Sequence, residues 1–483
     1  FDAESLTSLW VYKYALGGQP NCPIAYSDGY IYTGFWNSET KQANFVCLSV
    51  TDEDTTNTTE AKLATWTYAH NGFYWAGAYA CEDYVLVGTD DGSDGYTTGT
   101  ASILSLHPTT GVLLDEQKLT NVGDQRSSIM YDAATDAYYF TTKGGDFYQI
   151  KVEANGTFTE DSLRRLHLDN GAYDMKTPPM STSTPVIYNG RAYIGVSGIS
   201  QFGNFSGHNM TVIDLETFSI AYTVPTMGYP QTSGLLTTAY ENTDGYVYVY
   251  FIDNASPGMI RVIRDKKGMD EVDHSYTTMT TYSVNGVKKT IESGYVLFTP
   301  YGDEEQYAIC SPISDAEGNL YFKNDSARMM RLSSRMTSLE IVQQPEKKDY
   351  CVGKTFDGTG MKVIAHYANG TSKDITNYVS FTTDPLTMDD TEITVSYDPD
   401  KLFEDEDTVT GGYWQWYQDV NGQAGEVYYL PTATCTVTVV EPEPEVVLTG
   451  ITVTAPTKTE YEIGEELVLE GMVVTGTYSD ETT

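Results

Sequence analysis

Turn signals recur along the first two thirds of the chain at a nearly constant spacing, and this period constrains the fold more than any other feature. Each turn is followed at once by a short strand rich in tyrosine and β-branched residues, such as YIYTG or RAYIGV. The turns lie 54, 53, 54, 55 and then 73 residues apart, at Asp28-Gly29, Glu82-Asp83, Thr135-Asp136, Asn189-Gly190, Asp244-Gly245 and Glu317-Gly318. A constant period of this length indicates a repeated unit of antiparallel hairpins.

The unit from Thr184 to Val224 contains four short strands separated by turns. One four-stranded sheet cannot bury both of its apolar faces alone, so such sheets must stack side by side around an axis. We therefore predict an all-β chain in which residues 1–335 form a β-propeller of six to seven four-stranded blades. The long last interval is explained by an extra hairpin at Thr280 to Ile291. The strand from Leu9 to Tyr14 either completes the sixth blade and closes the ring, or follows a truncated blade upstream.

The pattern changes near Met336, where an internal duplication begins. Six residues keep their spacing between the two copies: Tyr350, Gly353, Gly360, Met361, Val363 and Tyr367 match Tyr461, Gly464, Gly471, Met472, Val474 and Tyr478. The segment EPEPE between the copies favours an extended, self-repelling spacer. We predict one domain at 336–440, a linker at 441–447 and a truncated second domain at 448–483.

Two resemblances accompany these patterns. The segments YCVGKTFDGTGMKVIAHYANGTSKDIT and TKTEYEIGEELVLEGMVVTGTYSDET resemble the bacterial immunoglobulin-like domain of group 3. The first copy departs from it by a long excursion from Asp398 to Pro431. The segments MGYPQTSGLLTTAYENTDGYVYVYFIDNASPGMI and EGNLYFKNDSARMMRL resemble quinoprotein-like (PQQ-type) propellers. Together these resemblances imply immunoglobulin-like β-sandwich domains after the propeller, in a secreted or wall-attached protein of Gram-positive bacteria.

Composition excludes some classes of function. The formal net charge is -39, which would repel a polyanionic backbone, so we expect no nucleic-acid partner. No apolar run approaches the ~18 residues that a membrane-spanning helix needs. Six cysteines are too few for a disulfide scaffold. Phe1 begins in mid-pattern and Thr483 ends inside a domain, so we expect the chain to be part of a longer, monomeric protein whose flanking domains are missing.

Aromatic and amide side chains gather in the segments predicted to be loops of the propeller. Trp36, Tyr74, Trp75, Phe202 and Asn204 would lie on the face around the central channel, where they could form a pocket for sugar rings or peptides. The alternative is that these rings pack between blades. A second candidate contact, Trp414 with Trp416, lies on the predicted long hairpin of the sandwich domain, where a local mini-core is the alternative.

Evidence for metal, disulfide or catalytic chemistry is weaker. Asp90, Asp91 and Asp94 could offer oxygens to calcium, although Asp-Gly pairs are also ordinary turn chemistry. Cys351 and Cys435 are candidates for a disulfide within one domain. The six histidines are scattered, and nucleophile elbows and phosphate loops are missing. No two cysteines are adjacent, as they are in quinoprotein dehydrogenases, so we expect no PQQ and no cofactor other than calcium.

These observations favour a non-catalytic extracellular module with a role in adhesion. In this interpretation the propeller face binds a glycan or protein ligand, and the immunoglobulin-like domains act as spacers. Two alternatives remain. One is an enzyme, either a quinoprotein-type oxidoreductase or a polysaccharide-cleaving propeller with a carboxylate pair in its channel. The other is a structural scaffold without its own ligand.

Overall fold

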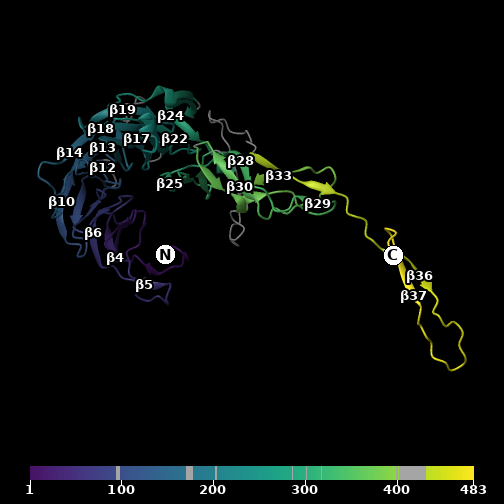
Figure 1. Cartoon of the computed structure of the whole chain (residues 1–483). Helices are drawn as coiled ribbons and strands as arrows, with labels where there is room; N and C mark the ends of the chain where they lie inside the picture. The colour runs from purple at the N-terminus through teal and green to yellow at the C-terminus, as the bar shows by residue number, and fades with distance from the viewer. Residues whose placement is uncertain are drawn as a thin grey trace. The chain divides into compact units, whose positions relative to one another are not determined.

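A computed structural model (Figure 1) divides the chain into two compact units, and the boundary along the chain lies between Ser333 and Ser334. The described residues are 1–93, 98–169, 178–201, 204–284, 287–300, 302–316, 318–334, 336–368, 370–398, 401 and 431–483. Within these ranges strands dominate, and the longest helix, α1 (Glu241–Asp244), has four residues. None of the helices in these ranges is long and apolar enough to cross a membrane.

The first unit is a succession of antiparallel sheets, each built from consecutive strands. The first sheet contains β2 (Ala25–Ser27), β3 (Tyr30–Gly34), β4 (Ala43–Ser49) and β6 (Trp66–His70). The second contains β7 (Tyr79–Ala80), β8 (Val85–Gly88), β9 (Ala101–Leu106) and β10 (Leu113–Leu119). The third contains β11 (Met130–Asp132), β12 (Ala137–Thr142), β13 (Asp146–Ile150) and β14 (Arg164–His167). Each sheet therefore corresponds to one predicted repeat.

Three further sheets follow in the same unit. The fourth contains β15 (Pro179–Met180), β16 (Val186–Tyr188), β17 (Arg191–Gln201), β18 (Asn204–Asp214) and β19 (Ser219–Pro225). The fifth contains β20 (Leu235–Thr237), β21 (Val247–Ile252), β22 (Ile260–Asp265), β24 (Val287–Phe298) and β23 (Thr277–Val284). The sixth contains β25 (Ile313–Ser314), β26 (Leu320–Lys323) and β27 (Met329–Leu332). The predicted extra hairpin is the pairing of β23 with β24 in the fifth sheet.

Apolar clusters fill the spaces between successive sheets. Phe45 of the first sheet shares a cluster with Leu104 of the second, and both are fully buried. Phe147 of the third sheet likewise shares a cluster with Ile194 of the fourth. Similar clusters join the second sheet to the third, the fourth to the fifth and the fifth to the sixth. This face-to-face stacking of sequential antiparallel sheets confirms the predicted propeller architecture.

The strand predicted to complete the last blade lies elsewhere. β1 (Trp10–Tyr12) pairs in parallel with β5 (Glu60–Lys62), whereas the sixth sheet has three strands within the described residues. The ring closure considered from the sequence is therefore not the pairing in this structure. The reason is packing: Trp10 and Tyr12 cover the apolar face of the first sheet that carries Val46.

The second unit contains an immunoglobulin-like sandwich. One sheet contains β28 (Met336–Gln343), β30 (Lys362–Tyr367) and β31 (Ser372–Asp374). Another contains β32 (Val379–Ser380), β33 (Glu392–Tyr397) and β34 (Thr432–Thr436). In addition, β29 (Asp349–Cys351) pairs with β35 (Thr438–Val440). Tyr350, Val363 and Val395 lie in its single buried core. A further pair, β36 (Leu448–Thr454) with β37 (Val473–Tyr478), belongs to the second copy.

The same tyrosine hydrogen-bonding arrangement occurs in both copies. The Tyr350 hydroxyl accepts a hydrogen bond from Asp357 N at 3.0 Å and lies 3.2 Å from the carbonyl of Lys347. In the second copy, the Tyr461 hydroxyl accepts from Val468 N at 2.9 Å and lies 3.0 Å from the carbonyl of Lys458. The partners stand at the same offsets in sequence, so the duplicated spacing reflects a duplicated local structure.

Candidate functional site

Loops from neighbouring sheets are joined by a regular set of backbone hydrogen bonds. In antiparallel sheets, the loop between the second and third strands and the connection to the next sheet emerge at the same strand ends. The bonds link these two kinds of loop: Phe73 N to Phe35 O, Asp90 N to Gly72 O, Gln125 N to Thr89 O, and Lys143 N to Asp124 O, at 2.9 to 3.0 Å. We call the surface formed by these loops in the first three sheets the loop face. Its main chain is fixed, so side chains there have defined neighbours.

Three of the predicted aromatic residues meet on the loop face. Trp36 follows β3, while Tyr74 and Trp75 lie in the connection to the second sheet. The ring centres of Trp36 and Tyr74 are 4.7 Å apart, and those of Tyr74 and Trp75 are 4.6 Å apart in a stacked arrangement. All three side chains are half-buried. They form a continuous aromatic platform that is partly exposed, in addition to packing between sheets.

Trp75 has a strained backbone. Its φ is +62°, in the left-handed region that bulky residues rarely occupy. Such a conformation costs on the order of 1–2 kcal/mol relative to a right-handed one. Backbone strain of this kind persists where the surroundings impose it and is concentrated at binding and catalytic sites. In this backbone conformation the Trp75 ring stacks on Tyr74.

A buried ion pair lies beside the platform. Arg126 donates to Asp90 through Nε at 3.1 Å and through Nη2 at 2.8 Å. The Arg126 side chain is 10 % exposed and that of Asp90 is 5 % exposed. The guanidinium carbon also lies 4.5 Å from the centre of the Tyr74 ring, a cation–π contact. Asp90 therefore fixes the guanidinium in one orientation against the aromatic platform.

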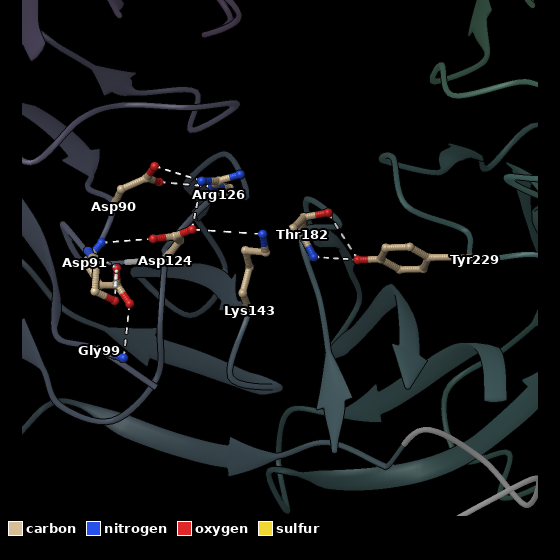
Figure 2. A network of polar contacts seen from close by, with 9 residues as sticks. Asp90, Asp91, Gly99, Asp124, Arg126, Lys143, Thr182 and Tyr229 are labelled. Atoms are coloured by element: carbon tan, nitrogen blue, oxygen red, sulfur yellow. Dashed lines mark hydrogen bonds and ion pairs between the residues drawn. The ribbon is translucent and has the colours of Figure 1, made fainter. Parts of the chain in front are cut away.

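The ion pair is part of a larger charged network. Arg126 Nη2 lies 2.8 Å from Asp124 Oδ2, and Lys143 Nζ lies 3.9 Å from the same oxygen. Figure 2 shows Arg126 and Lys143 both reaching toward Asp124, with Asp91 on its other side. Burial, reinforced by the negative charge of Asp90, raises the pKa of the Asp124 carboxyl to about 7. Burial and the nearby Arg126 lower the pKa of Lys143 to about 8.

Trp36 of the platform and the ion pair border a cavity of about 240 Å³. Its lining residues are Trp36, Lys41, Asn71, Asp90, Gly92, Ser93 and Arg126. A larger depression of about 540 Å³ lies on the sandwich domain, bordered by residues such as Lys362 and Asp374. These two side chains are about half exposed and form a surface ion pair, and Asp374 also accepts hydrogen bonds from Thr376. The cavity on the loop face is the better candidate site because buried charge and the Trp36 ring meet there, next to the other rings of the platform.

The side chains of the other predicted binding residues are not described by the structure. Phe202, Trp414 and Trp416 lie outside the described residues. Asn204 begins β18, where its backbone pairs with that of Gln201. The contribution of these four residues to binding therefore stays a prediction.

The proposed calcium ligands have other partners. Asp90 is bound to Arg126, and Asp91 accepts hydrogen bonds from Gly99 N at 3.0 Å and Ser93 N at 2.8 Å. Asp94 lies outside the described residues. Within the parts of the chain that the structure describes, no three metal-binding side chains are grouped together. The calcium site stays a prediction.

The candidate disulfide is not formed. All six cysteines are free thiols, including Cys351 and Cys435. Cys351 pairs with Val440, whereas Cys435 pairs with Ile393 in another sheet. The register places Cys435 five residues from the partner of Cys351, up to about 16 Å of extended strand. A disulfide requires its Cα atoms to lie within about 7 Å.

The sequence interpretation missed Arg126, Asp124 and Lys143, although a signal was available. The backbone pairing aligns Gly72-Phe73-Tyr74 with Asp124-Gln125-Arg126 in the next connection. Tyr74 and Arg126 therefore occupy equivalent positions in successive repeats. Aligning the connecting loops, and not only the turns and strands, would have placed Arg126 on the loop face.

Comparisons with known proteins give a family match for part of the chain and similar solved structures. Residues 343–410 match the bacterial Ig-like domain (group 3). Among solved structures, the chain is similar to BamB from Moraxella catarrhalis, with 12 % identity and a TM-score of 0.35 over 73 % of this chain and 84 % of that one. It is also similar to a candidate 6-phosphogluconolactonase from Bacteroides uniformis, with 10 % identity and a TM-score of 0.36 over 74 % of this chain and 83 % of that one. No curated protein matches the chain.

Proposed function

We propose that the first unit is a non-catalytic binding module and that its loop face recognises a glycan or protein ligand. The observation that carries this proposal is the cluster of Trp36, Tyr74 and Trp75 beside an Arg126 guanidinium fixed by Asp90. Partly exposed rings provide contact area at little conformational cost, and a fixed guanidinium adds directional hydrogen bonding. This combination suits the recognition of a sugar ring or an extended peptide.

A catalytic role for the carboxylates is less well supported. Asp90 Oδ2 and Asp124 Oδ2 each lie 2.8 Å from Arg126 Nη2, so they are at most twice that distance apart. Such a separation would suit a carboxylate pair that cleaves glycosidic bonds. However, the side chain of Asp124 is only 2 % exposed, and the guanidinium contacts both carboxylates. The pair therefore supports the site structurally in our account.

The second unit would act as a spacer. Its match to the bacterial Ig-like domain supports a modular bacterial protein. A row of similar domains is also suggested by the matching hydrogen bonds of Tyr350 and Tyr461 and by the Glu-Pro linker between the two copies. We propose that this row holds the propeller away from the cell wall of a Gram-positive bacterium. The net charge of -39 would keep such a surface protein soluble.

A glycan array and a panel of surface proteins, both probed with the full chain, test the proposal. The probes are the native chain, the Trp36→Ala/Tyr74→Ala variant, and Tyr26→Ala as a control for an exposed tyrosine away from the site. We expect at least one ligand whose signal falls tenfold or more in the double variant and is kept in the control. Two empty panels, or equal loss in both variants, would contradict the proposed function.

A further inference from the structure

The described residues of the candidate site leave one nitrogen of Arg126 without a partner. Nε and Nη2 are both engaged by Asp90, and Nη2 also contacts Asp124. Among the residues that the structure describes, none accepts a hydrogen bond from Nη1. The side chain is nevertheless nine-tenths buried and lines the 240 Å³ cavity. Nη1 is therefore a donor held in one orientation at the cavity, and a ligand oxygen there can accept from it.

Asn71 offers a second unused polar group at the same cavity. No described residue forms a hydrogen bond with its side-chain amide, which can both donate and accept. A Cβ atom on Gly92 would lie 2.7 Å from Asn71 Cγ, so the glycine allows the amide to pack closely against the loop. Gly92 has a φ of +70°, which also favours glycine. The amide therefore has a fixed place in the cavity lining.

The charges around the cavity balance one another. Asp90 already neutralises Arg126. The other charged side chains at the cavity are equal in number, with Asp91 and Asp124 on the acidic side and Lys143 and the lining residue Lys41 on the basic side. The chain as a whole carries a net charge of -39. An anionic ligand would therefore meet no excess of positive charge in the cavity and would be repelled by the surrounding protein. This arrangement favours a neutral ligand with hydroxyl groups.

The size of the cavity limits what can enter. Pockets that bury a whole drug-sized ligand usually measure about 300–1,000 Å³. At about 240 Å³ this cavity is smaller, and it suits a single ring with the rest of the ligand outside. Trp36 supplies an aromatic wall, and Arg126 and Asn71 supply hydrogen-bonding groups.

We propose that the cavity holds one neutral pyranose ring of a glycan, packed against Trp36, with a hydroxyl oxygen accepting from Arg126 Nη1 and another paired with the Asn71 amide. This inference rests on the proposed function and specifies its ligand class. The ligand class that it specifies is a glycan and not a protein, and a neutral sugar and not an acidic one.

Isothermal titration of the full chain tests the inference. The neutral probes are cellohexaose, mannohexaose and chitohexaose, and the acidic probe is hexagalacturonate, all at 0.15 M salt. We expect at least one neutral probe to bind at least tenfold more tightly than the acidic probe. Asn71→Ala and Trp36→Ala should each weaken that binding tenfold or more. The matched control Asn242→Ala, in the exposed α1, should change it less than twofold.

The outcomes separate the inference from the proposed function. Tighter binding of hexagalacturonate, or neutral binding that Asn71→Ala and Trp36→Ala leave unchanged, overturns the inference while the module remains a binding protein. Absence of binding to all three neutral probes also overturns it. If the glycan array and the surface-protein panel also show no binding, the proposed function is contradicted as well.

Discussion

Asp90 and Arg126 form a bidentate ion pair between two loops of adjacent sheets, with 3.1 Å from Nε to Oδ1 and 2.8 Å from Nη2 to Oδ2. Asp90 follows β8 in the second sheet, and Arg126 lies in the connection to the third sheet. The pair thus links neighbouring sheets and also orients the guanidinium against Tyr74. Stability and binding are expected to depend on the same contact.

Removing one member of this pair should destabilise the first unit strongly. Because the other charge would stay buried without a partner, Asp90→Ala or Arg126→Ala should each cost about 3–5 kcal/mol. The double variant should lose about 1–3 kcal/mol less stability than the sum of the losses in the two single variants. Urea unfolding of the four proteins measures this coupling.

The exposed pair of Lys267 and Glu216 serves as a control for that cycle. These side chains are 52 % and 78 % exposed, so their coupling should stay below about 1 kcal/mol. Equal coupling in the two cycles, or additive losses at Asp90 and Arg126, would show that the buried pair does not link the sheets.

The Asp124 carboxyl should make stability depend on pH. Burial, together with the charge of Asp90, raises its pKa from an ordinary 3.8 to about 7. Between these values the folded protein keeps a proton that the unfolded chain has released, so stability should fall as the pH rises from about 4 to about 7. The free energy of unfolding of the native chain, minus that of Asp124→Asn, should decrease over this range.

The comparison with Asp124→Asn isolates this carboxyl from other groups. Burial lowers the pKa of His208 to about 4, which has the opposite effect on stability but is shared by both proteins. Urea unfolding at several pH values gives the difference curve. A flat curve, or one that rises toward pH 7, would mean that Asp124 does not titrate as described.

Much of the fold was readable from the sequence because its signals are local. An Asn-Gly or Asp-Gly turn fixes a hairpin by its own backbone conformation, so β3 and β17 begin directly after Gly29 and Gly190. The position of β1 was not readable in this way. Its pairing with β5 depends on where Trp10 and Tyr12 find an apolar surface, which only the folded sheets provide.

The site was predictable in part for the same reason. Trp36, Tyr74 and Trp75 stood out because large aromatic residues in loops are visible in a sequence. Arg126 and Asp124 did not, because their role arises from the register between the loops of successive sheets. The absence of a disulfide at Cys351 could not be predicted for the same reason, since its distance from Cys435 is set by the pairing of β29 with β35.

The strain at Trp75 can be measured separately from the loss of its ring. Trp75→Gly and Trp75→Ala remove the same indole, but only glycine adopts a φ of +62° without strain. The glycine variant should therefore be about 1 kcal/mol more stable than the alanine variant in urea unfolding. At Ala78, which has no positive φ, replacement by glycine should destabilise instead. An alanine variant at 75 as stable as the glycine variant would argue against strain.

Loss of the Tyr350 hydroxyl should weaken the sandwich domain. In Tyr350→Phe the part-buried hydrogen bonds of the hydroxyl with Asp357 N and the Lys347 carbonyl are lost, at a cost of about 0.5–1.5 kcal/mol. The equivalent Tyr461→Phe should cost less because water can reach the groups around Val468, which is 39 % exposed. Hydrogen exchange of the β28 and β30 amides in the full chain measures the loss of stability in Tyr350→Phe. Similar exchange in Tyr350→Phe and the native chain would contradict it.

Hydrogen exchange in the presence of ligand tests the central claim most directly, namely that the loop face of the first unit is the binding surface. The full chain would be compared with and without the neutral hexasaccharide that binds most tightly in titration. The account predicts slower exchange at residues 71–75 and 91–93, around the cavity lined by Trp36 and Arg126. Protection confined to residues 336–398, or to the opposite strand ends around Gly29 and Gly190, would contradict it.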